Sequence, residues 1–286
     1  MGEKVFLNDG IVDIENARVP VSDGGLLYGA GLFETMRANN GVVFRLDFHL
    51  DRLLSSADKL LITTTYSKEH LHEAVYKTLE ANALQNARLR LTITSGSISA
   101  GDEKPKSTLI VTATELVPYP AEYYRNGILV ILCPFRQNPS DPTCGHKTTN
   151  YLSRISALDF ARRRNAAEAL WFTVDNRLAE GCVSNAFLVK DDQLLTPQLD
   201  TPVLPGIART AIAELADQQG LDLIQKDLYI DDCLEADEIF LTNVIMKVLP
   251  VHSIEKHPVG NGKVGPITKK FQKLFDDLIE KECGEK

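Results

Sequence analysis

Two residues give this chain its most specific chemical potential. Lys147 lies in a polar segment, Gly145–Asn150, between an apolar run and a helical run. Glu180 opens a segment of small residues, Gly181–Asn185. A lysine amine can form a Schiff base with an aldehyde, and a carboxylate can keep a pyridine nitrogen protonated. The two residue types together are the minimal equipment for pyridoxal 5'-phosphate (PLP) chemistry.

Each of these residues also has an ordinary interpretation. A lysine in a polar loop is usually solvated, and a glutamate beside a turn usually serves only that turn. The loop around Lys147 follows an apolar strand, so it starts from the interior, and a desolvated lysine near other cations becomes nucleophilic. Small residues after Glu180 would let a ligand approach the backbone closely.

A phosphate-binding site is the third requirement of this chemistry. Leu204–Arg209 places free backbone amides at the start of a predicted helix, which suits an anion, although such helix starts are common. Thr242 and Asn243, at the end of a predicted strand, offer further donors. Arg52 on an early helix could add a bidentate charge, or it is a solvated arginine.

Two further residues could recognise a substrate. Arg90 shares one face of a predicted strand with Arg88, because Leu89 and Leu91 alternate with them. That face is either a polar outer surface or a receptor for the carboxylate of an amino or oxo acid. Tyr28 lies among glycines, where its hydroxyl could reach a ligand or simply be half-buried in a strand.

Composition and motifs narrow the class of protein. The 286 residues carry a net charge of −8, which argues against broad nucleic-acid binding. The six histidines are scattered, so we expect no metal site. The sequence contains no GxSxG, P-loop or GxGxxG motif, and no apolar run long enough for a membrane span. Five cysteines without CxxC spacing, and an N-terminus without a long apolar stretch, predict reduced thiols, no signal peptide and a cytoplasmic location.

The hydrophobic periodicity predicts a mixed helix-and-sheet protein of two domains. Residues 1–117 form a small α+β domain, with strands at 5–13, 26–46, 87–96 and 107–116 and helices at 47–62 and 68–83. The helix at 47–62 has an apolar face that runs from Phe48 to Leu61. Residues 118–124 are a candidate linker. Residues 125–286 form a larger, barrel-like domain with helices at 150–166, 207–219 and 268–281.

These blocks together resemble the class IV (fold type IV) PLP-dependent enzymes. That family includes branched-chain aminotransferases, D-amino acid aminotransferases and 4-amino-4-deoxychorismate lyases. The resemblance covers nearly the whole chain, and it rests on the ordered motifs YGAGLFETMR, HLDRL, HKTTNYL, EGCVSNAFLV, LPGIAR and ADEIFLTNVIMKVLPV. It implies a small α+β N-terminal domain, a larger pseudo-barrel α/β C-terminal domain, and homodimers with shared active sites.

The resemblance also implies a role for each matching residue. Lys147 would carry the Schiff base and move a proton, and Glu180 would pair with the pyridine nitrogen. The phosphate would be held by Arg52, Thr242 and the backbone amides of Ile207 and Ala208. Tyr151 would lie near the phenolic oxygen of the cofactor, and Leu204 would pack on its ring. Asn243 is expected among the cofactor-binding residues as well. Tyr28, Thr35 and Arg90 would bind the substrate.

The resemblance leaves the family member open. Branched-chain enzymes usually have FEG where this chain has Phe33-Glu34-Thr35, and both that triplet and the stretch 87–99 look lyase-like. D-amino acid aminotransferases place an arginine at the position of Ser95, whereas Arg90 and Tyr151 fit branched-chain enzymes. We expect an aminotransferase that acts on an amino acid and a 2-oxo acid. The alternatives are 4-amino-4-deoxychorismate lyase, which releases 4-aminobenzoate and pyruvate, and a binding protein with an inert lysine.

Overall fold

A computed structural model describes residues 3–97 and 106–284 of the chain. The chain divides into two compact units. Unit 1 comprises Met1–Val117, His146–Asn150 and Ile279–Lys286, and unit 2 comprises Pro118–Gly145 and Tyr151–Leu278. The mixed helix-and-sheet class expected from the sequence is confirmed. The predicted domain boundaries stay a prediction; the predicted linker 118–124 contains the start of a short helix, α4 (Ala121–Asn126).

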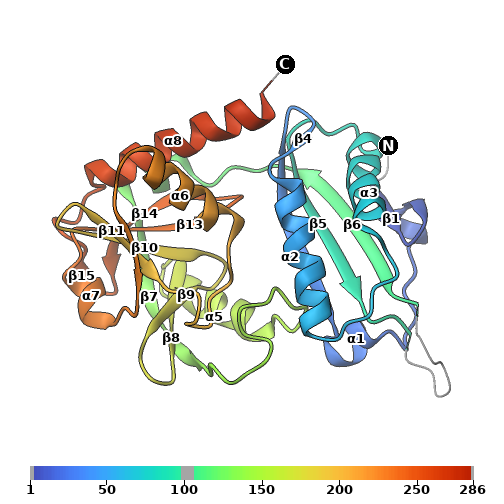
Figure 1. Cartoon of the computed structure of the whole chain (residues 1–286), viewed down its shortest axis with the longest axis horizontal. Helices are drawn as coiled ribbons and strands as arrows, with labels where there is room; N and C mark the ends of the chain where they lie inside the picture. The colour runs from blue at the N-terminus through green and yellow to red at the C-terminus, as the bar shows by residue number, and fades with distance from the viewer. Residues whose placement is uncertain (1–2, 98–105, 285–286) are drawn as a thin grey trace. The chain divides into compact units, whose positions relative to one another are not determined.

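Unit 1 is a six-stranded antiparallel sheet with two helices on one face (Figure 1). The strand order is β2-β1-β6-β5-β3-β4. The strands are β1 (Lys4–Leu7), β2 (Gly10–Asp13), β3 (Gly31–Asn39), β4 (Val42–Val43), β5 (Ala87–Thr94) and β6 (Thr108–Glu115). The helices are η1 (Ile14–Asn16), α1 (Gly24–Tyr28), α2 (Leu46–Lys59) and α3 (Lys68–Ala81).

Residues with positive φ explain one turn and one helix end in unit 1. Asn40 and Gly41 have positive φ, as the tight turn between β3 and β4 requires. The stretch 26–28, expected as strand, instead forms the end of α1, which closes at Gly29 in the left-handed conformation. Ile98 and Ser99, the last residues of the lyase-like stretch, lie outside the described residues.

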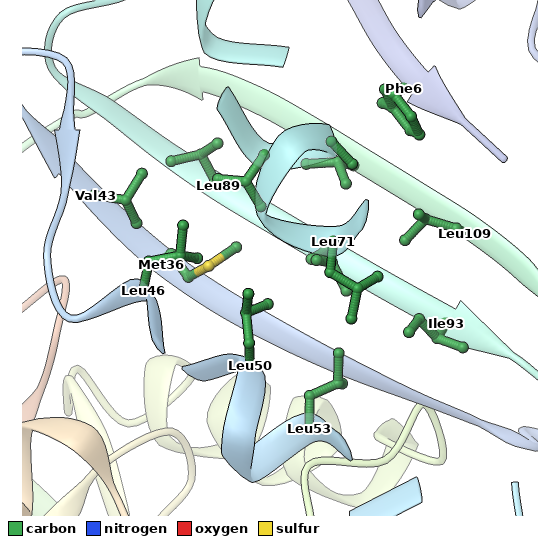
Figure 2. Close-up of a cluster of buried hydrophobic side chains, with 14 of the residues drawn as sticks. Phe6, Met36, Val43, Leu46, Leu50, Leu53, Leu71, Leu89, Ile93 and Leu109 are labelled. Carbon is green, nitrogen blue, oxygen red and sulfur yellow. The ribbon is translucent and has the colours of Figure 1, made fainter. Parts of the chain in front are cut away.

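The core of unit 1 fills the space between α2, α3 and the sheet. Figure 2 shows Leu46 and Leu50 of α2 near Met36 of β3, with Leu53 of α2 and Leu89 of β5 in the same cluster. The predicted apolar face of α2 was partly wrong. Phe48 is 50% exposed and Leu61 is 89% exposed, whereas the polar His49 and Ser56 are buried. The register of the helix is therefore set by polar partners as well as by leucines.

Unit 2 is built on a nine-stranded curled sheet, so the barrel-like expectation is confirmed. The strand order is β12-β11-β10-β13-β14-β7-β8-β9, with β15 beside β14. The strands are β7 (Ile128–Gln137), β8 (Glu168–Thr173), β9 (Leu178–Gly181), β10 (Asn185–Lys190), β11 (Gln193–Pro197), β12 (Leu223–Lys226), β13 (Glu238–Asn243), β14 (Lys247–Ile254) and β15 (His257–Pro258).

Helices cover this sheet and complete the core of unit 2 (Figure 1). Besides α4 they are α5 (Leu152–Arg162), α6 (Ile207–Gln218), α7 (Ile230–Leu234) and α8 (Pro266–Cys283). Phe240 of β13 stacks against Phe187 of β10 at 5.1 Å and against Phe271 of α8 at 5.9 Å, measured between ring centroids. None of the helices in the described part of the chain has the length and apolar composition to cross a membrane.

Candidate active site

Lys147 belongs to a short segment that extends the edge of the unit 1 sheet. The segment His146–Asn150 runs antiparallel to the start of β3, with Thr148 opposite Leu32. The Phe33 amide donates to the Lys147 carbonyl at 2.9 Å, and the Thr149 amide donates to the Gly31 carbonyl at 2.8 Å. The backbone of Lys147 is thus fixed by a strand more than a hundred positions away in the sequence, unlike that of a mobile surface loop.

Phe33 links Lys147 to two of the predicted substrate residues. The Lys147 Nζ lies 4.5 Å from the centroid of the Phe33 ring, and the Arg90 guanidinium carbon lies 3.7 Å from it. Arg90 is the cross-strand partner of Thr35. The predicted alternation of β5 is confirmed, because Arg88 and Arg90 are exposed while Leu89 and Leu91 are buried. In unit 1 the Arg90 guanidinium and the Lys147 amine therefore lie near the same aromatic ring, that of Phe33, and Thr35 lies opposite Arg90 on the neighbouring strand.

Tyr28 lies at the end of the short helix α1 rather than in the predicted strand. Its side chain is 71% exposed, and its neighbours Leu26 and Leu27 are also exposed. Its role as a substrate residue stays a prediction.

Arg52 is held by a buried carboxylate that sequence reasoning assigned no role. Its Nε and Nη2 donate to the two carboxylate oxygens of Glu34 at 2.8 and 2.5 Å. The Nδ1 of His49 lies 2.7 Å from Glu34 Oε2. Burial raises the pKa of Glu34, but Arg52 and His49 outweigh this effect and lower it to about 2. Glu34 is therefore ionised and fixes the plane of the Arg52 guanidinium.

Glu180 is the centre of a second group of residues, which lies in unit 2. Its Oε1 accepts from Arg154 Nη2 at 2.5 Å, and its Oε2 accepts from the Leu204 amide at 3.0 Å. The amide of Gln137 lies 3.5 Å from Oε1. Both oxygens are thereby oriented, so Glu180 is a built carboxylate acceptor rather than a solvated residue beside a turn.

Arg154 is a functional candidate that sequence reasoning missed. It donates to the Gly181 carbonyl at 2.8 Å, and its guanidinium carbon lies 4.8 Å from the Trp171 ring centroid. Burial lowers the pKa of Arg154, but Glu180 outweighs this effect and raises it. The available signal was an arginine at the start of a helix, where a cation is unfavourable unless a carboxylate lies nearby.

Glu168 of β8 is the second residue that was missed, and it supports the turn after Glu180. Its carboxylate accepts from the amides of Cys182 and Val183 at 3.0 and 3.1 Å and from the Ser184 hydroxyl at 2.8 Å. Burial raises the pKa of Glu168, while these hydrogen bonds oppose the rise. A Cβ at Gly181 would lie 2.2 Å from Ser184 Oγ, so the small residue noted in the sequence is required sterically.

The start of α6 lies close to the ends of β10 and β13. Asn185 donates from Nδ2 to the Leu204 carbonyl at 2.9 Å and is the cross-strand partner of Thr242. Helix α6 begins at Ile207 after Gly206, where a Cβ would lie 2.0 Å from Asn185 Oδ1. The hydroxyl of Thr242 is buried and has no hydrogen-bond partner among the described residues.

These features fit the phosphate of PLP. The first amides of a helix need acceptors, and a buried unpaired hydroxyl is costly until a ligand satisfies it. Glu180 is joined to the same group through Leu204. Unit 2 therefore brings together the predicted residues Glu180, Leu204, Ile207, Ala208 and Thr242, and unit 1 brings together Lys147, Thr35 and Arg90.

Tyr151 and Asn243 are both held by carbonyls of the turn after Glu180. The Tyr151 hydroxyl donates to the Cys182 carbonyl at 3.2 Å, and burial raises its pKa. Asn243 donates to the Val183 carbonyl at 2.9 Å and accepts from the amides of Ile245 and Met246. Asn243 therefore shapes the turn. Among the described residues, no group of three or more His, Cys, Asp or Glu side chains could hold a metal ion.

Comparison with known proteins identifies the family. The family model for amino-transferase class IV matches residues 31–254, which is most of the chain. The protein belongs to the class IV aminotransferase family, and the resemblance inferred from the motifs is confirmed.

Two relatives align over nearly the full length of the chain. A Methanocaldococcus jannaschii protein provisionally named branched-chain-amino-acid aminotransferase is 35% identical over 97% of this chain and 97% of its own. A D-alanine aminotransferase of Listeria monocytogenes is 31% identical over 99% of this chain and 98% of its own. These relatives confirm the prediction from the sequence that the protein is an enzyme.

Solved structures confirm fold type IV. The branched-chain amino acid aminotransferase of Escherichia coli has a TM-score of 0.92 and 31% identity, with 100% of this chain and 97% of that chain covered. A Legionella pneumophila protein provisionally named 4-amino-4-deoxychorismate lyase has a TM-score of 0.83 and 25% identity, with 92% and 96% covered. The aminotransferase interpretation is the better supported, and the lyase remains the alternative.

Proposed function

We propose that this protein is a PLP-dependent aminotransferase that moves an amino group between an amino acid and a 2-oxo acid. The observation that carries the proposal is the Lys147 segment, which is hydrogen-bonded to β3 with the lysine Nζ over the Phe33 ring. When bound, PLP supplies an aldehyde and a ring that withdraws electrons from the substrate carbon. The family membership and the matching motifs support this cofactor.

The residues of the chain then take the following roles. Lys147 attaches the cofactor and carries the proton that leaves and returns to the substrate carbon. Glu180, with one oxygen on Arg154 and the other on the Leu204 amide, accepts the ring N–H. The phosphate is held by Arg52, the amides of Ile207 and Ala208, and the Thr242 hydroxyl, while Asn243 supports the adjacent turn. Tyr151 would interact with the phenolic oxygen of the bound cofactor, and Leu204 would pack on its ring.

Substrate recognition is proposed for Arg90, Thr35 and Tyr28. Arg90 is the permanent cation that an amino acid or 2-oxo acid carboxylate requires, and Thr35 lies opposite it on β3. The two relatives above carry the names of a branched-chain amino acid aminotransferase, given provisionally, and of a D-alanine aminotransferase, so both L- and D-amino donors are substrates to be tested.

The second candidate is 4-amino-4-deoxychorismate lyase. Thr35 in place of glycine, the lyase-like sequence of the stretch 87–99 and the Legionella neighbour favour it. A half-reaction distinguishes the two enzymes. Purified protein with PLP and a panel of L- and D-amino acids is monitored for conversion of the cofactor to its pyridoxamine form. Conversion with any amino acid supports the aminotransferase, and its absence together with pyruvate release from aminodeoxychorismate supports the lyase.

Covalent attachment tests the lysine directly. Borohydride reduction of the PLP-loaded protein should fix the cofactor on the peptide that contains Lys147, as read by mass spectrometry. Lys147→Ala should lose this adduct while it keeps the circular dichroism spectrum of the parent, and Lys190→Ala is the matched control. An adduct that persists on another lysine in Lys147→Ala would refute the assignment. Glu180→Gln should lower turnover far more than cofactor retention.

We also propose a homodimer in the cytoplasm. The exposed apolar side chains of α1, Leu26 (67%) and Leu27 (52%), beside Tyr28, are the kind of surface that an identical partner covers. The five cysteines are all unpaired, as in a reducing compartment. Light scattering of the wild type and of Leu26→Glu tests the dimer: the wild type should have twice the chain mass, and the variant should dissociate.

A further inference from the structure

His49 shares the Glu34 carboxylate with Arg52, a residue of the proposed phosphate site. It lies on α2 and is 1% exposed, with Nδ1 bonded to Glu34. Its Nε2 is buried without a hydrogen-bond partner among the described residues. An ionised Glu34 accepts a hydrogen bond from the Nδ1–H of His49, so the neutral ring keeps its lone pair on Nε2. A buried lone pair without a donor is unfavourable, so a proton taken up at Nε2 would remove this cost if an anion balanced the new charge.

Three charged groups act on His49. Glu34 on β3 contributes one negative charge, and Arg52, one turn after His49 on α2, contributes one positive charge. The third group that acts on His49 is the ammonium of Lys147 in the segment beside β3. Before a ligand binds, the two cations oppose a third positive charge on His49. A bound phosphate monoester would reverse this balance, because it brings up to two negative charges.

We propose that His49 is the proton-linked part of the phosphate site, taking up one proton from solvent at Nε2 when a phosphate monoester binds beside Arg52. Arg52 supplies the permanent charge, and His49 supplies a second charge only when the anion is present. Glu34 is the positioning residue for both, since it fixes the guanidinium plane and the protonated Nδ1. The inference rests on the proposed function, because the phosphate is that of PLP.

The direction of the His49 pKa agrees with this assignment. Burial lowers the pKa of His49, Glu34 raises it, and Arg52 and Lys147 lower it further, so that the net direction is down. The ring is therefore neutral in the ligand-free protein near neutral pH. An anion adds the opposite Coulombic effect and favours the charged ring. By linkage, cofactor affinity must then fall as the pH rises through the His49 titration of the complex.

The test uses nitrogen-15 NMR of the histidine rings in the full-length protein. The probe is pyridoxamine 5'-phosphate, which lacks the aldehyde and leaves the Lys147 amine unmodified. The six histidines are assigned through bonds to their own backbones and titrated with the probe, with pyridoxamine, and without ligand. We expect the His49 midpoint to rise by at least about one pH unit with the phosphate compound only, which is about tenfold tighter proton binding.

Variants separate the charge of His49 from its shape. In His49→Asn the amide can still donate toward Glu34 but cannot gain a proton. This variant should bind pyridoxamine 5'-phosphate with a smaller pH dependence than wild type, because the phosphate of the probe still titrates but residue 49 does not. Its affinity should be about tenfold weaker than that of wild type at pH values below the His49 midpoint. His146→Asn is the matched control, since His146 is bonded to Ser56 of the same helix at 2.9 Å, and it should keep the pH dependence of the wild type.

Each outcome decides the inference. If the probe binds while the His49 midpoint stays in place, the proton linkage is overturned and the proposed function stands. If neither pyridoxamine 5'-phosphate nor PLP binds, both are overturned. If the His49 midpoint rises equally with pyridoxamine, the linkage belongs to the ring of the cofactor, and the phosphate assignment is wrong.

Discussion

The ion pair between Arg154 and Glu180 offers a quantitative test of how this site is held. The two side chains are 16% and 7% exposed, and the charged atoms are 2.5 Å apart. Arg154→Met keeps most of the side-chain volume but leaves a buried carboxylate with one amide at 3.0 Å and a second at 3.5 Å. Removing one partner of a buried pair costs about 3 kcal/mol or more in the free energy of unfolding.

A double-mutant cycle isolates the pair from the other contacts of Arg154. Arg154→Met also removes the hydrogen bond to Gly181 and the contact with Trp171, and these losses recur in Arg154→Met/Glu180→Gln. Glu180→Gln removes the charge without a large change in shape. The coupling free energy of the cycle should be about 2 kcal/mol, the range for a hydrogen bond between charged groups.

The assay is urea unfolding followed by the fluorescence of Trp171, the single tryptophan of the chain, which reports on unit 2. Midpoints and slopes are compared, because Arg154→Met also changes the spectrum of the adjacent tryptophan. Arg163→Met, at the C-cap of the same helix, is the matched control. Its pair with Asp159 is 77% and 53% exposed, so the midpoint should move little. Additive effects in the cycle, or an equal loss in the control, would refute the reasoning.

Two further predictions follow from the polar groups around the site. Glu34→Gln should destabilise unit 1 by roughly 3 kcal/mol at neutral pH, because the pKa of Glu34 is lowered from 4.5 to about 2. Because the pKa of Glu34 is lower in the folded protein, the ionised carboxylate stabilises the fold fully above pH 4.5, and this contribution is lost as the pH falls toward 2. The difference in stability between Glu34→Gln and wild type should therefore shrink over that interval. Hydrogen exchange of β3 and β5 amides measures it, with the exposed Glu115→Gln as control, and a difference that is independent of pH would contradict the assignment. Thr242→Val should stabilise the ligand-free protein by about 1 kcal/mol, since it removes a buried unpaired hydroxyl, yet weaken PLP binding about tenfold. Thermal unfolding measures the stability, and cofactor titration measures the affinity for PLP. A variant that is less stable and binds PLP more weakly, or is more stable and binds PLP more tightly, would count against a phosphate contact.

The sequence alone determined where most helices and strands lie and which residues have side chains suited to the proposed chemistry. The leucines of α2, the alternation along β5 and the Asn-Gly turn after β3 are local patterns, and each was recovered because burial repeats with the period of the element. Lys147 and Glu180 could be proposed as site residues because their motifs are contiguous in sequence. The same logic failed at Phe48 and His49. Periodicity ranks apolar residues for burial and has no information about a carboxylate that arrives from another strand.

Only the tertiary structure decided how these residues are held. Lys147 is fixed by backbone hydrogen bonds to Gly31 and Phe33, and the charge on Arg52 is balanced by Glu34. Glu180 is oriented by Arg154 and by the Leu204 amide. A buried charge is tolerated only when a partner with suitable geometry meets it. In this protein those partners come from distant positions, so no local pattern in the chain could identify them.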